Sequence, residues 1–412
     1  MKKFKKSLLI LALIIPVATT LASCGGDEES TDTSSTTQID PDFHVDKSLI
    51  YGMDDIYWQE YSWKGISYTL EHQLFESLGV KSVRFWAHAT WMLSNPTKVN
   101  EKNYQIARDS LDEIKDKGYQ IIGLNHGSFK TEYIGETNST VSSAKPPRDL
   151  SEGSKYRRWL EDYETSWYNL VNLFPEITIW EIDNETNNTD FMSRVGGGQF
   201  SKYQMAQITY DMMYFGSRGI HRANPNAVTV MGGLVVRGAE NFLEDLYNMI
   251  YNVDGAGVWD STNPDDYFQC ACWHPYMSGF NKKSFINVNN SIYEVVKRRE
   301  GKDKRVFLTE AGINDSNYSN NEELCAQYIV DMYEACRDDL YYVESLHYYR
   351  MWDLEGKRYG LFTDPTQKRE VGDYNMAAPK PAAFAFQKMT GATGDLHIYE
   401  NYVLEHGVPP KP

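Results

Sequence analysis

Cysteine is scarce in this sequence, with five residues among 412. Cys270 and Cys272 are two positions apart on one apparent strand. Cys325 and Cys336 are eleven apart on an apparent helix, about 16 Å at 1.5 Å per residue, which is too far for a disulfide between them. No cysteine and histidine show the spacing of metal ligands. The sequence therefore predicts no metal site and four buried free thiols, and it leaves a strand-to-helix bridge open.

Positive charge is also in short supply. The chain has 41 Lys and Arg against 57 Asp and Glu, a formal net charge of −16. A chain of this charge is repelled by polyanions, which argues against nucleic acid or an anionic lipid surface as a partner. A neutral partner fits the balance better.

Long apolar runs are missing as well, because the run from Leu8 to Val17 is too short to span a membrane. Lysines precede this run, and small residues follow it up to Ser23. This is the layout of a secretory signal peptide, which we assign to residues 1–23.

The end of this leader, Leu21-Ala22-Ser23-Cys24, resembles the lipobox of bacterial lipoproteins. The resemblance implies cleavage before Cys24, lipidation of its thiol, and a secreted protein anchored to the bacterial cell envelope. The alternative is cleavage near Ala22 and a soluble product. Residues 24–46 are predicted to be a lipid-anchored flexible stalk, because residues 25–38 contain no apolar side chain to bury.

Residues 47–395 repeat one pattern eight times, a short apolar run followed by a longer amphipathic one. Three of the helical runs end at glycine, at Gly79, Gly118 and Gly219, as the left-handed residue after a helix requires. The predicted strands are Leu49 to Met53, Val80 to Trp86, Tyr119 to Leu124, Ile177 to Ile182, Ala227 to Met231, Tyr267 to Trp273, Val306 to Thr309 and Val343 to Tyr349.

Alternating strands and helices predict parallel strands, and eight of them favour a closed (β/α)8 TIM barrel of the α/β class. A doubly wound open sheet is the rival, but no Gly-rich phosphate loop follows the first strand. Residues 396–412 are then a C-terminal tail. In such a barrel the active site lies at the carboxyl ends of the strands, and the long loop from Gly127 to Ser154 is expected to wall a cleft there.

Polar side chains follow six of the predicted strands and would meet at this rim. Two of them, Glu185 after the fourth strand and Glu310 after the seventh, would face each other across it. Two carboxyl groups placed in this way are what the hydrolysis of a glycosidic bond needs. The polar strand ends are Arg84 to His88, Asn125-His126, Asp183 to Glu185, His274 to Tyr276, Glu310, and Tyr349 to Trp352.

These segments resemble the clan A glycoside hydrolases, in which strand four ends in Asn-Glu and strand seven in Glu, and most closely glycoside hydrolase family 5. The resemblance covers about residues 47–392, and Thr186 stands where family 5 usually has Pro. It implies that Glu185 is the acid/base, Glu310 the nucleophile, and that no cofactor is needed. It also implies a substrate-binding set made of Arg84, His126, Asn184, His274, Tyr276 and Trp352.

The resemblance gives each of these residues an expected role, and some of them have a structural alternative. Arg84 and the Tyr276 hydroxyl would keep Glu310 ionised, although Arg84 could also serve only to neutralise Glu181. Asn184 would donate to the sugar 2-hydroxyl and Trp352 would be the stacking floor. The histidines at 126 and 274 would line the subsite of the attacked sugar, or be satisfied core histidines.

The sequence thus predicts a monomeric, retaining glycosidase that cleaves a β-glucan, mannan or xylan. Two rivals remain: a carbohydrate-binding surface lipoprotein without turnover, and a transglycosidase that uses the same residues. The sugar, the linkage, endo or exo action, the membrane that carries the anchor and the oligomeric state are left open.

Overall fold

The structure, a computed structural model, describes residues 48–56, 66–127, 146–147, 149–151, 154–192, 198–354, 356–365 and 377–407. The predicted signal peptide, Cys24, the stalk and most of the long loop after Gly127 lie outside these residues. Within the described part of the chain, no helix has both the length and the apolar character that a membrane crossing requires.

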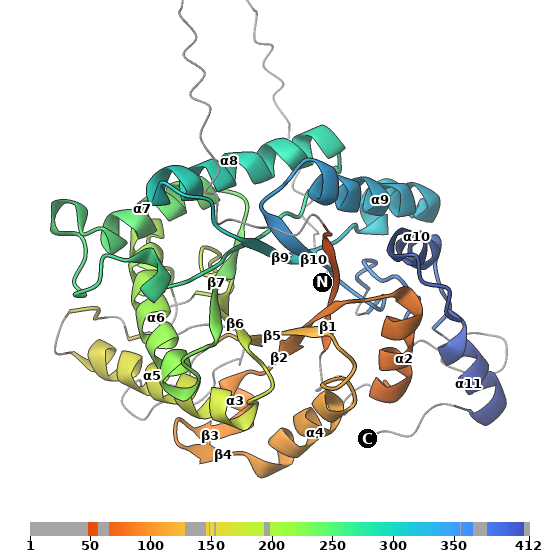
Figure 1. Ribbon diagram of the computed structural model, residues 1–412, viewed down its shortest axis with the longest axis horizontal. Coiled ribbons are helices and arrows are strands. Elements are labelled where there is room, and N and C mark those ends of the chain that lie inside the picture. The colour runs from red at the N-terminus through yellow and green to blue at the C-terminus, as the bar shows by residue number, and fades with distance from the viewer. Residues whose placement is uncertain are drawn as a thin grey trace, which may run out of the picture. The chain divides into compact units, whose positions relative to one another are not determined.

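Eight parallel strands close into a barrel in which each strand pairs with its neighbours in chain order and the last pairs with the first (Figure 1). All eight predicted strands are present, so the (β/α)8 prediction is confirmed. The strands are β1 (Ile50–Ile56), β2 (Ser82–Trp86), β5 (Gln120–Asn125), β6 (Ile179–Asn184), β7 (Val228–Val235), β8 (Ala271–His274), β9 (Val306–Ala311) and β10 (Val343–Tyr348).

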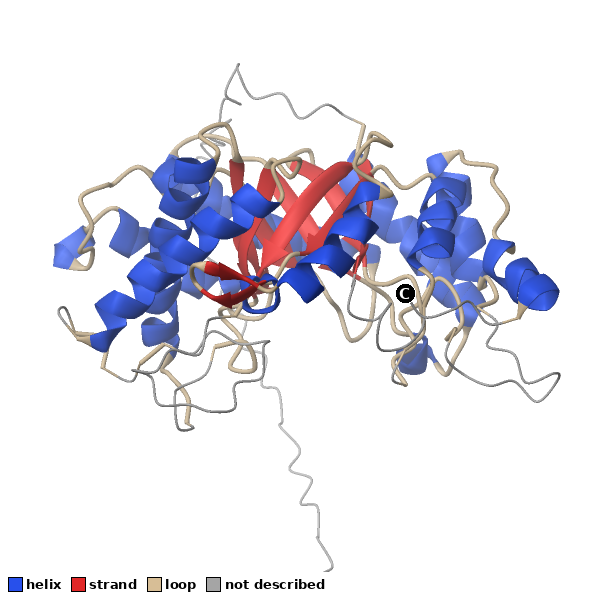
Figure 2. Ribbon diagram, turned by 90° about the horizontal axis from the view of Figure 1, so that it is seen from below, coloured by secondary structure: helices blue, strands red, loops and turns tan. Residues whose placement is uncertain are grey.

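Helices surround the strands, which lie at the centre in Figure 2. Ser67, Asn100, Ser154 and Ser201 each cap a helix N-terminus with a side-chain oxygen, because the first N–H groups of a helix have no partner within it. The barrel helices are α2 (Tyr68–Leu78), α4 (Glu101–Asp112), α5 (Lys155–Leu173), α6 (Lys202–Ala223), α7 (Ala239–Ile250), α8 (Lys282–Glu300), α9 (Glu322–Asp338) and α10 (Pro381–Thr390).

Two of the three predicted helix ends at glycine were wrong. Helix α4 ends at Asp112, and a run of turns separates it from Gly118. Gly79 does terminate α2 in the left-handed conformation, but Gly219 lies inside α6, which runs on to Ala223. A Cβ at position 219 would overlap the carbonyl oxygen of Glu164 in α5. This glycine therefore allows α5 and α6 to approach closely, and the sequence pattern alone does not distinguish that use from a helix cap.

The structure also contains elements that sequence analysis missed. After β2 the chain forms α3 (Ala89–Met92) and a small antiparallel pair, β3 (Leu93–Asn95) and β4 (Lys98–Val99). Residues predicted as a C-terminal tail form helix α11 (Ile398–His406), which packs on α2. Within the residues that the structure describes, there are also three 3-10 turns, at Val253–Gly255, Pro264–Asp266 and Asp315–Tyr318.

The inside of the barrel changes character along its axis. Ile122, Val230, Cys270 and Phe307 form a small apolar cluster that is separate from the main core between strands and helices. Thr309 lies two residues after Phe307 in the same strand. At this level of the barrel, polar side chains replace the apolar ones. The four cysteines from 270 to 336 are buried free thiols, as predicted. The polar layer leads to the carboxyl ends of the strands.

Candidate active site

One buried guanidinium joins carboxylates from three strands at this end of the barrel. Arg84 in β2 binds Glu181 of β6 through Nε to Oε2 at 2.7 Å and Nη2 to Oε1 at 2.8 Å. Its Nη1 lies 2.5 Å from Oε1 of Glu310 in β9 and 3.3 Å from Oδ2 of Asp54 in β1. The planar fork of five N–H donors suits such multiple binding. Arg84 therefore neutralises Glu181 and also holds Glu310.

The end of β6 turns sharply, and this turn places Asn184 and Glu185. Asp183 and Glu185 both have positive φ, 70° and 46°, a region that residues with a Cβ seldom adopt. Hydrogen bonds hold the turn: the Asn184 N–H donates to Asp183 Oδ1 at 2.7 Å, and the Glu185 N–H donates to the carbonyl of Gly233 in β7 at 2.8 Å. A Cβ on Gly233 would overlap the ring of His274, so only glycine fits beside this turn.

Asn184 is oriented by the same guanidinium. Its Oδ1 accepts a hydrogen bond from Nη2 of Arg84 at 2.8 Å. The Nδ2 group is therefore the side of the amide that remains to donate to a ligand.

Glu310 is held in its ionised form. Burial alone would raise its pKa, but the charges of His274 and Arg84, together with hydrogen bonds from Arg84 and Tyr276, outweigh burial and lower the pKa below the ordinary carboxyl value. The Tyr276 hydroxyl donates to Oε2 of Glu310 at 3.1 Å, and Nδ1 of His274 lies 3.7 Å from the same oxygen. These contacts bring Tyr276 and His274, both in the predicted substrate-binding set, to the carboxyl group of Glu310.

Glu185 lies close to Glu310. Its Oε1 is 3.1 Å from Nδ1 of His274, and its Oε2 accepts a hydrogen bond from Nδ2 of Asn188 at 2.9 Å. One carboxylate oxygen of Glu185, one of Glu310 and a ring nitrogen of His274 all lie within 4.8 Å of one another. The two glutamates, 125 residues apart in the chain, thus face the same space.

His274 connects the two glutamates to the polar layer below. Its Nε2 is 3.1 Å from the Thr309 hydroxyl, which in turn lies 3.1 Å from Oε1 of Glu181. Burial would lower the pKa of His274, but the charge of Glu310 and the hydrogen bonds of the ring with Cys272 and Glu185, in which the charged imidazole is the donor, raise it well above the ordinary value. A charged imidazole between two carboxylates is consistent with this geometry.

His126 lies among aromatic rings, to one side of the carboxylates. Its ring centroid is 4.0 Å from that of His88, 5.5 Å from that of Trp86 and 5.9 Å from that of Phe191. The Trp86 indole donates to Oδ1 of Asp54 at 2.8 Å, which ties this wall to the Arg84 cluster. His126 is therefore beside the site, and its buried ring is largely packed against its neighbours.

Trp352 does not join the site, which corrects the sequence prediction. Its indole is 1% exposed and donates a hydrogen bond to Oε1 of Glu71 in α2 at 2.7 Å. Its ring packs against Phe362 and against Tyr399 of α11. The side chain fills the core between the barrel and its last helices, so it offers no face to a ligand.

Three tyrosine rings pack together next to Glu310. The ring of Tyr349, the residue after β10, has its centroid 6.2 Å from that of Tyr276 and 5.6 Å from that of Tyr359. Tyr276 and Tyr359 are 5.8 Å apart, and all three rings are partly exposed. These three form a tyrosine cluster beside Glu310.

Sequence reasoning missed Asp54, Thr309 and Asn188, and it placed Tyr349 at a strand end without giving it a role. Asp54 immediately follows the predicted first strand and Thr309 ends the predicted seventh, so their positions at strand ends were available as a signal. Asn188 belongs to no motif, and the strand-end segment that contains Tyr349 drew attention to Trp352 instead. Their importance comes from contacts that only the folded chain makes.

In the part of the chain that the structure describes, two groups of side chains have the donor types that a metal ion takes. They are Glu185 with His274 and Glu310, and Glu181 with Cys272 and His274. In each group one carboxylate already binds the Arg84 guanidinium, whose fixed positive charge opposes a second cation at the same oxygen atoms. The arrangement is therefore better suited to holding charge and moving a proton than to binding a metal.

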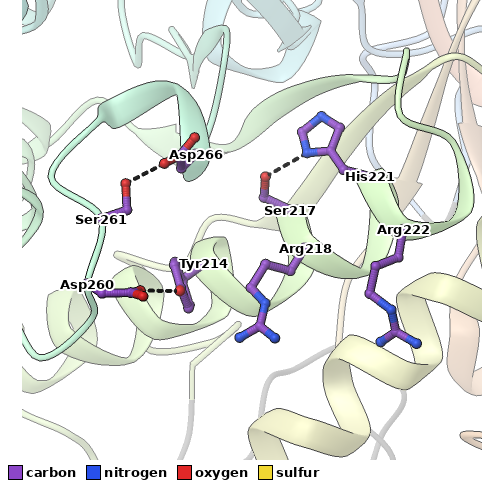
Figure 3. A pocket seen from close by; sticks show the side chains of 8 residues that line it. All are labelled: Tyr214, Ser217, Arg218, His221, Arg222, Asp260, Ser261 and Asp266. Carbon is purple, nitrogen blue, oxygen red and sulfur yellow. Dashed lines mark hydrogen bonds between the residues drawn. The ribbon is translucent and has the colours of Figure 1, made fainter.

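A separate pocket of about 740 Å³ lies at the opposite end of the barrel, where α6 ends and the chain approaches β8 (Figure 3). Its two arginines bind Glu164 of α5, Arg222 at 2.7 Å and Arg218 at 3.6 Å, and Tyr214 donates to Asp260 at 2.8 Å. The lining residues are Tyr214, Ser217, Arg218, His221, Arg222, Asp260, Ser261 and Asp266.

Comparison with known proteins supports the fold. No protein-family model and no curated protein sequence matches the chain. Among solved structures, the chain is similar to a family 39 glycoside hydrolase from Bacteroides cellulosilyticus WH2, with a TM-score of 0.55 and 17% identity. That match covers 84% of this chain and 63% of the other, so the chain spans less than two thirds of that protein.

A second similar structure is the family 1 β-glucosidase from Thermotoga maritima in complex with isofagomine lactam. The TM-score is 0.56, the identity 12%, and the match covers 82% of this chain and 88% of the other. At these identities the likeness establishes the barrel fold. The resemblance to family 5 and the lipoprotein signal stay predictions.

Proposed function

We propose that this protein is a retaining glycoside hydrolase that cleaves β-linked polysaccharides or oligosaccharides of the β-glucan, mannan or xylan type. The observation that carries the proposal is the approach of Glu185 and Glu310, which have carboxylate oxygens within 4.8 Å of each other. Carboxyl groups about 5 Å apart fit a double displacement, whereas inverting enzymes leave room for a water molecule between them. The proteins of similar structure are themselves glycoside hydrolases by description.

In the first step Glu185 gives its proton to the glycosidic oxygen while Glu310 attacks the anomeric carbon. The bond to the leaving group breaks as the bond to Glu310 forms. In the second step Glu185 takes a proton from water, and the water oxygen displaces Glu310. Two inversions return the sugar with its original configuration.

The surrounding groups fit these roles. The lowered pKa of Glu310 keeps the nucleophile ionised, and Arg84 and Tyr276 supply the compensating charge and hydrogen bond. The Nδ2 group of Asn184 is placed to donate to the 2-hydroxyl of the attacked sugar. Tyr349 takes over from Trp352 as the stacking face beside the nucleophile, because its ring is partly exposed next to Tyr276.

The two rivals use the same fold. A transglycosidase would differ only in the acceptor of the second step, a sugar instead of water. A binding protein without turnover would not need two buried glutamates with compensating charges around them, because burying carboxylates costs free energy. The complete set of supports around Glu310 therefore favours an enzyme.

We also propose where the protein is located in the cell. The lipobox-like segment at Leu21 to Cys24 supports a lipoprotein anchored to the bacterial cell envelope, and we propose that it acts as a monomer. Replacing Cys24 by Ser should move the protein from the membrane fraction to the soluble fraction of cells that express it. An unchanged distribution would remove the anchor from the proposal.

The catalytic roles are tested by a panel of defined oligosaccharides, read by product mass and anomeric configuration. Glu310→Ala should lose activity by several orders of magnitude, and azide should restore turnover with an α-glycosyl azide as product. Glu185→Ala with azide should instead give the β-glycosyl azide, because the intermediate on Glu310 still forms. Glu323→Gln, an exposed change in α9, is the control. Inverted products from the unaltered protein would refute the proposal.

A further inference from the structure

Phe191 is a large apolar side chain at the rim of the barrel that lies outside the core. Its ring is partly exposed, whereas the next side chain, Met192, is fully buried in the main core. Within the described residues, Phe191 neither belongs to an apolar core cluster nor packs against one. Its ring lies beside that of His126, with the centroids 5.9 Å apart. An apolar ring held in this way keeps surface available for a ligand.

The backbone of Phe191 is tied to Glu185 through two consecutive turns. The N–H of Asn188 donates to the carbonyl of Glu185 at 2.7 Å. The carbonyl of Asn188 accepts from the N–H of Phe191 at 3.1 Å and from that of Met192 at 3.0 Å. The side chain of Asn188 also donates to Oε2 of Glu185 at 2.9 Å. The position of Phe191 is therefore set relative to the Glu185 carboxyl group.

Asn187 fixes these turns to the barrel. Its Nδ2 donates to the carbonyl of Val235 in β7 at 2.7 Å, and its Oδ1 accepts from the N–H of Val235 at 2.9 Å. The carbonyl of Asn187 accepts from Nζ of Lys202 at 2.5 Å. Because Asn187 is buried and bonded in this way, Phe191 is carried by a segment that is already ordered before a ligand arrives.

Phe191 lies on the side of the rim across from the nucleophile. Its neighbour His126 follows β5, and Glu310 lies in β9. In the closed barrel, β9 is four strands away from β5 in either direction, so the two strands stand opposite each other. The ring of Phe191 is therefore at the far edge of the site from Glu310.

The two carboxylate oxygens of Glu185 have different neighbours. Oε1 lies 3.1 Å from Nδ1 of His274, and that nitrogen lies 3.7 Å from Oε2 of Glu310. Oε2 of Glu185 instead binds Asn188. The turn that leads to Phe191 therefore extends from the side of Glu185 that does not face Glu310.

The reaction defines what occupies each side of Glu185. In a double displacement, the nucleophile attacks the anomeric carbon from the face opposite the leaving group, and the acid protonates the oxygen that departs with that group. The sugar that leaves is therefore on the far side of Glu185 from Glu310, where Phe191 lies. The tyrosine cluster beside Glu310 is on the side of the attacked sugar instead.

We propose that the ring of Phe191 packs against the sugar of the leaving group and makes the enzyme select substrates from which a pyranose, not a small alcohol, departs. The inference rests on the proposed function, because it takes Glu185 as the acid. The C–H face of a β-linked pyranose is apolar and suits a partly exposed aromatic ring. This contact lasts only until the glycosidic bond breaks, so Phe191 assists the first step and not the attack of water on the glycosyl-enzyme.

The first experiment compares two leaving groups that both need a proton from Glu185, only one of which is a sugar. The substrates are a β-linked oligosaccharide and the methyl β-glycoside with the same glycone, the sugar being the one that the panel of oligosaccharides identifies. Phe191→Ala should lower kcat/KM about three- to tenfold on the oligosaccharide and leave the methyl glycoside unchanged. Phe191→Trp, which keeps an aromatic face, should retain activity on both.

Two further variants serve as controls. Tyr349→Ala, beside the nucleophile, should slow both substrates, because the attacked sugar is common to them. Phe384→Ala, an exposed phenylalanine of α10, should change neither. Equal losses on the two substrates in Phe191→Ala would show that the ring only supports the position of Glu185, and they would overturn the inference. Full activity on both would overturn it as well.

The second experiment detects the contact without turnover. 4-Fluorophenylalanine in place of Phe191, in the Glu310→Ala variant, reports by ¹⁹F NMR on the β-linked tetraoses of glucose, mannose and xylose, which stay intact in this variant. Its signal should shift on titration with the tetraose that the unaltered protein cleaves. The same label in place of Phe384 should not shift.

These measurements separate the inference from the proposed function. If a tetraose is cleaved by the unaltered protein but does not shift the label at position 191, Phe191 does not contact the substrate, and the inference fails alone. If no tetraose is cleaved but one of them shifts the label, the proposed function fails and the sugar contact at Phe191 stands. No cleavage and no shift would overturn both.

Discussion

The hydroxyl of Tyr276 donates a hydrogen bond to Oε2 of Glu310 over 3.1 Å, and Arg84 binds the other oxygen. Both contacts favour the ionised carboxylate that a nucleophile needs. Because activity is lost as the pH falls through the pKa of Glu310, a contact that lowers this pKa extends activity toward acid.

Replacing Tyr276 by Phe should therefore raise the pKa of Glu310 and move the acidic limb of kcat/KM upward by about 0.5–1 pH unit. The measurement is a pH profile of kcat/KM on the best oligosaccharide of the panel. Tyr203→Phe, on the exposed start of α6, is the control. A shift of the acidic limb to lower pH would contradict the assignment of Glu310.

Replacing Arg84 by Met should destabilise the protein by about 3–5 kcal/mol, because Glu181, Asp54 and Glu310 would lose their shared buried cation. Urea unfolding at neutral pH gives this free energy. Arg108→Met is the matched control, since Arg108 pairs with Asp112 and Glu176 near the surface and such a pair contributes less than about 1 kcal/mol. Equal losses in the two variants would count against the buried cluster as a stabilising unit.

Trp352 and Tyr349 should respond to mutation in opposite ways. Trp352→Phe removes a buried hydrogen bond to Glu71 and should cost about 1–3 kcal/mol of stability with little change in kcat/KM. Tyr349→Ala should lower kcat/KM by about tenfold if its ring stacks on the sugar, with a smaller loss of stability. Melting temperatures and kcat/KM values measured for both variants test this prediction. Loss of activity in Trp352→Phe alone would restore the original sequence prediction.

We expect Asp183 to make the folded state less stable as the pH rises. Burial raises its pKa from 3.8 to about 7, against hydrogen bonds from the N–H groups of Asn184 and Gly127 that lower it. The folded state therefore holds a proton that the unfolded chain releases above about pH 4, so this group's contribution to stability falls as the pH rises from 4 to 7.

Asp183→Asn carries no such proton. Its stability relative to the unaltered protein should therefore increase between pH 4 and pH 7 and level off above that. Melting temperatures measured at half-unit pH steps test this. A difference between the two proteins that does not change with pH would show that Asp183 is ionised throughout.

Much of the fold was predictable because it depends on local patterns. Strands that are buried on both faces are continuous apolar runs, and eight of them alternating with helices specify parallel pairing and closure. Gly79 ends its helix as expected, since a left-handed residue is needed there. Gly219 was misjudged because its neighbour across the interface, Glu164, is 55 residues away in the sequence.

In the candidate site, too, some features follow from local patterns and others depend on residues that are distant in the sequence. Glu185 and Glu310 were found because each ends a strand, and the ends of parallel strands meet at one rim. Trp352 also follows a strand, yet its indole turns to Glu71 of α2, since burying this large ring between the barrel and α11 removes apolar surface from water. The residues next to Trp352 in the sequence do not indicate that its side chain packs against the helices.

The sequence by itself determined the order and type of the elements, the barrel they form and which glutamates reach its rim, because periodicity and strand order are properties of neighbouring residues. Only the tertiary structure decided which oxygen of Glu185 meets Asn188, that Arg84 serves Asp54, Glu181 and Glu310 together, and that a tyrosine instead of Trp352 stands beside the nucleophile. Those outcomes depend on side chains from distant segments competing for the same space and the same charge, and such competition is settled only when the chain packs.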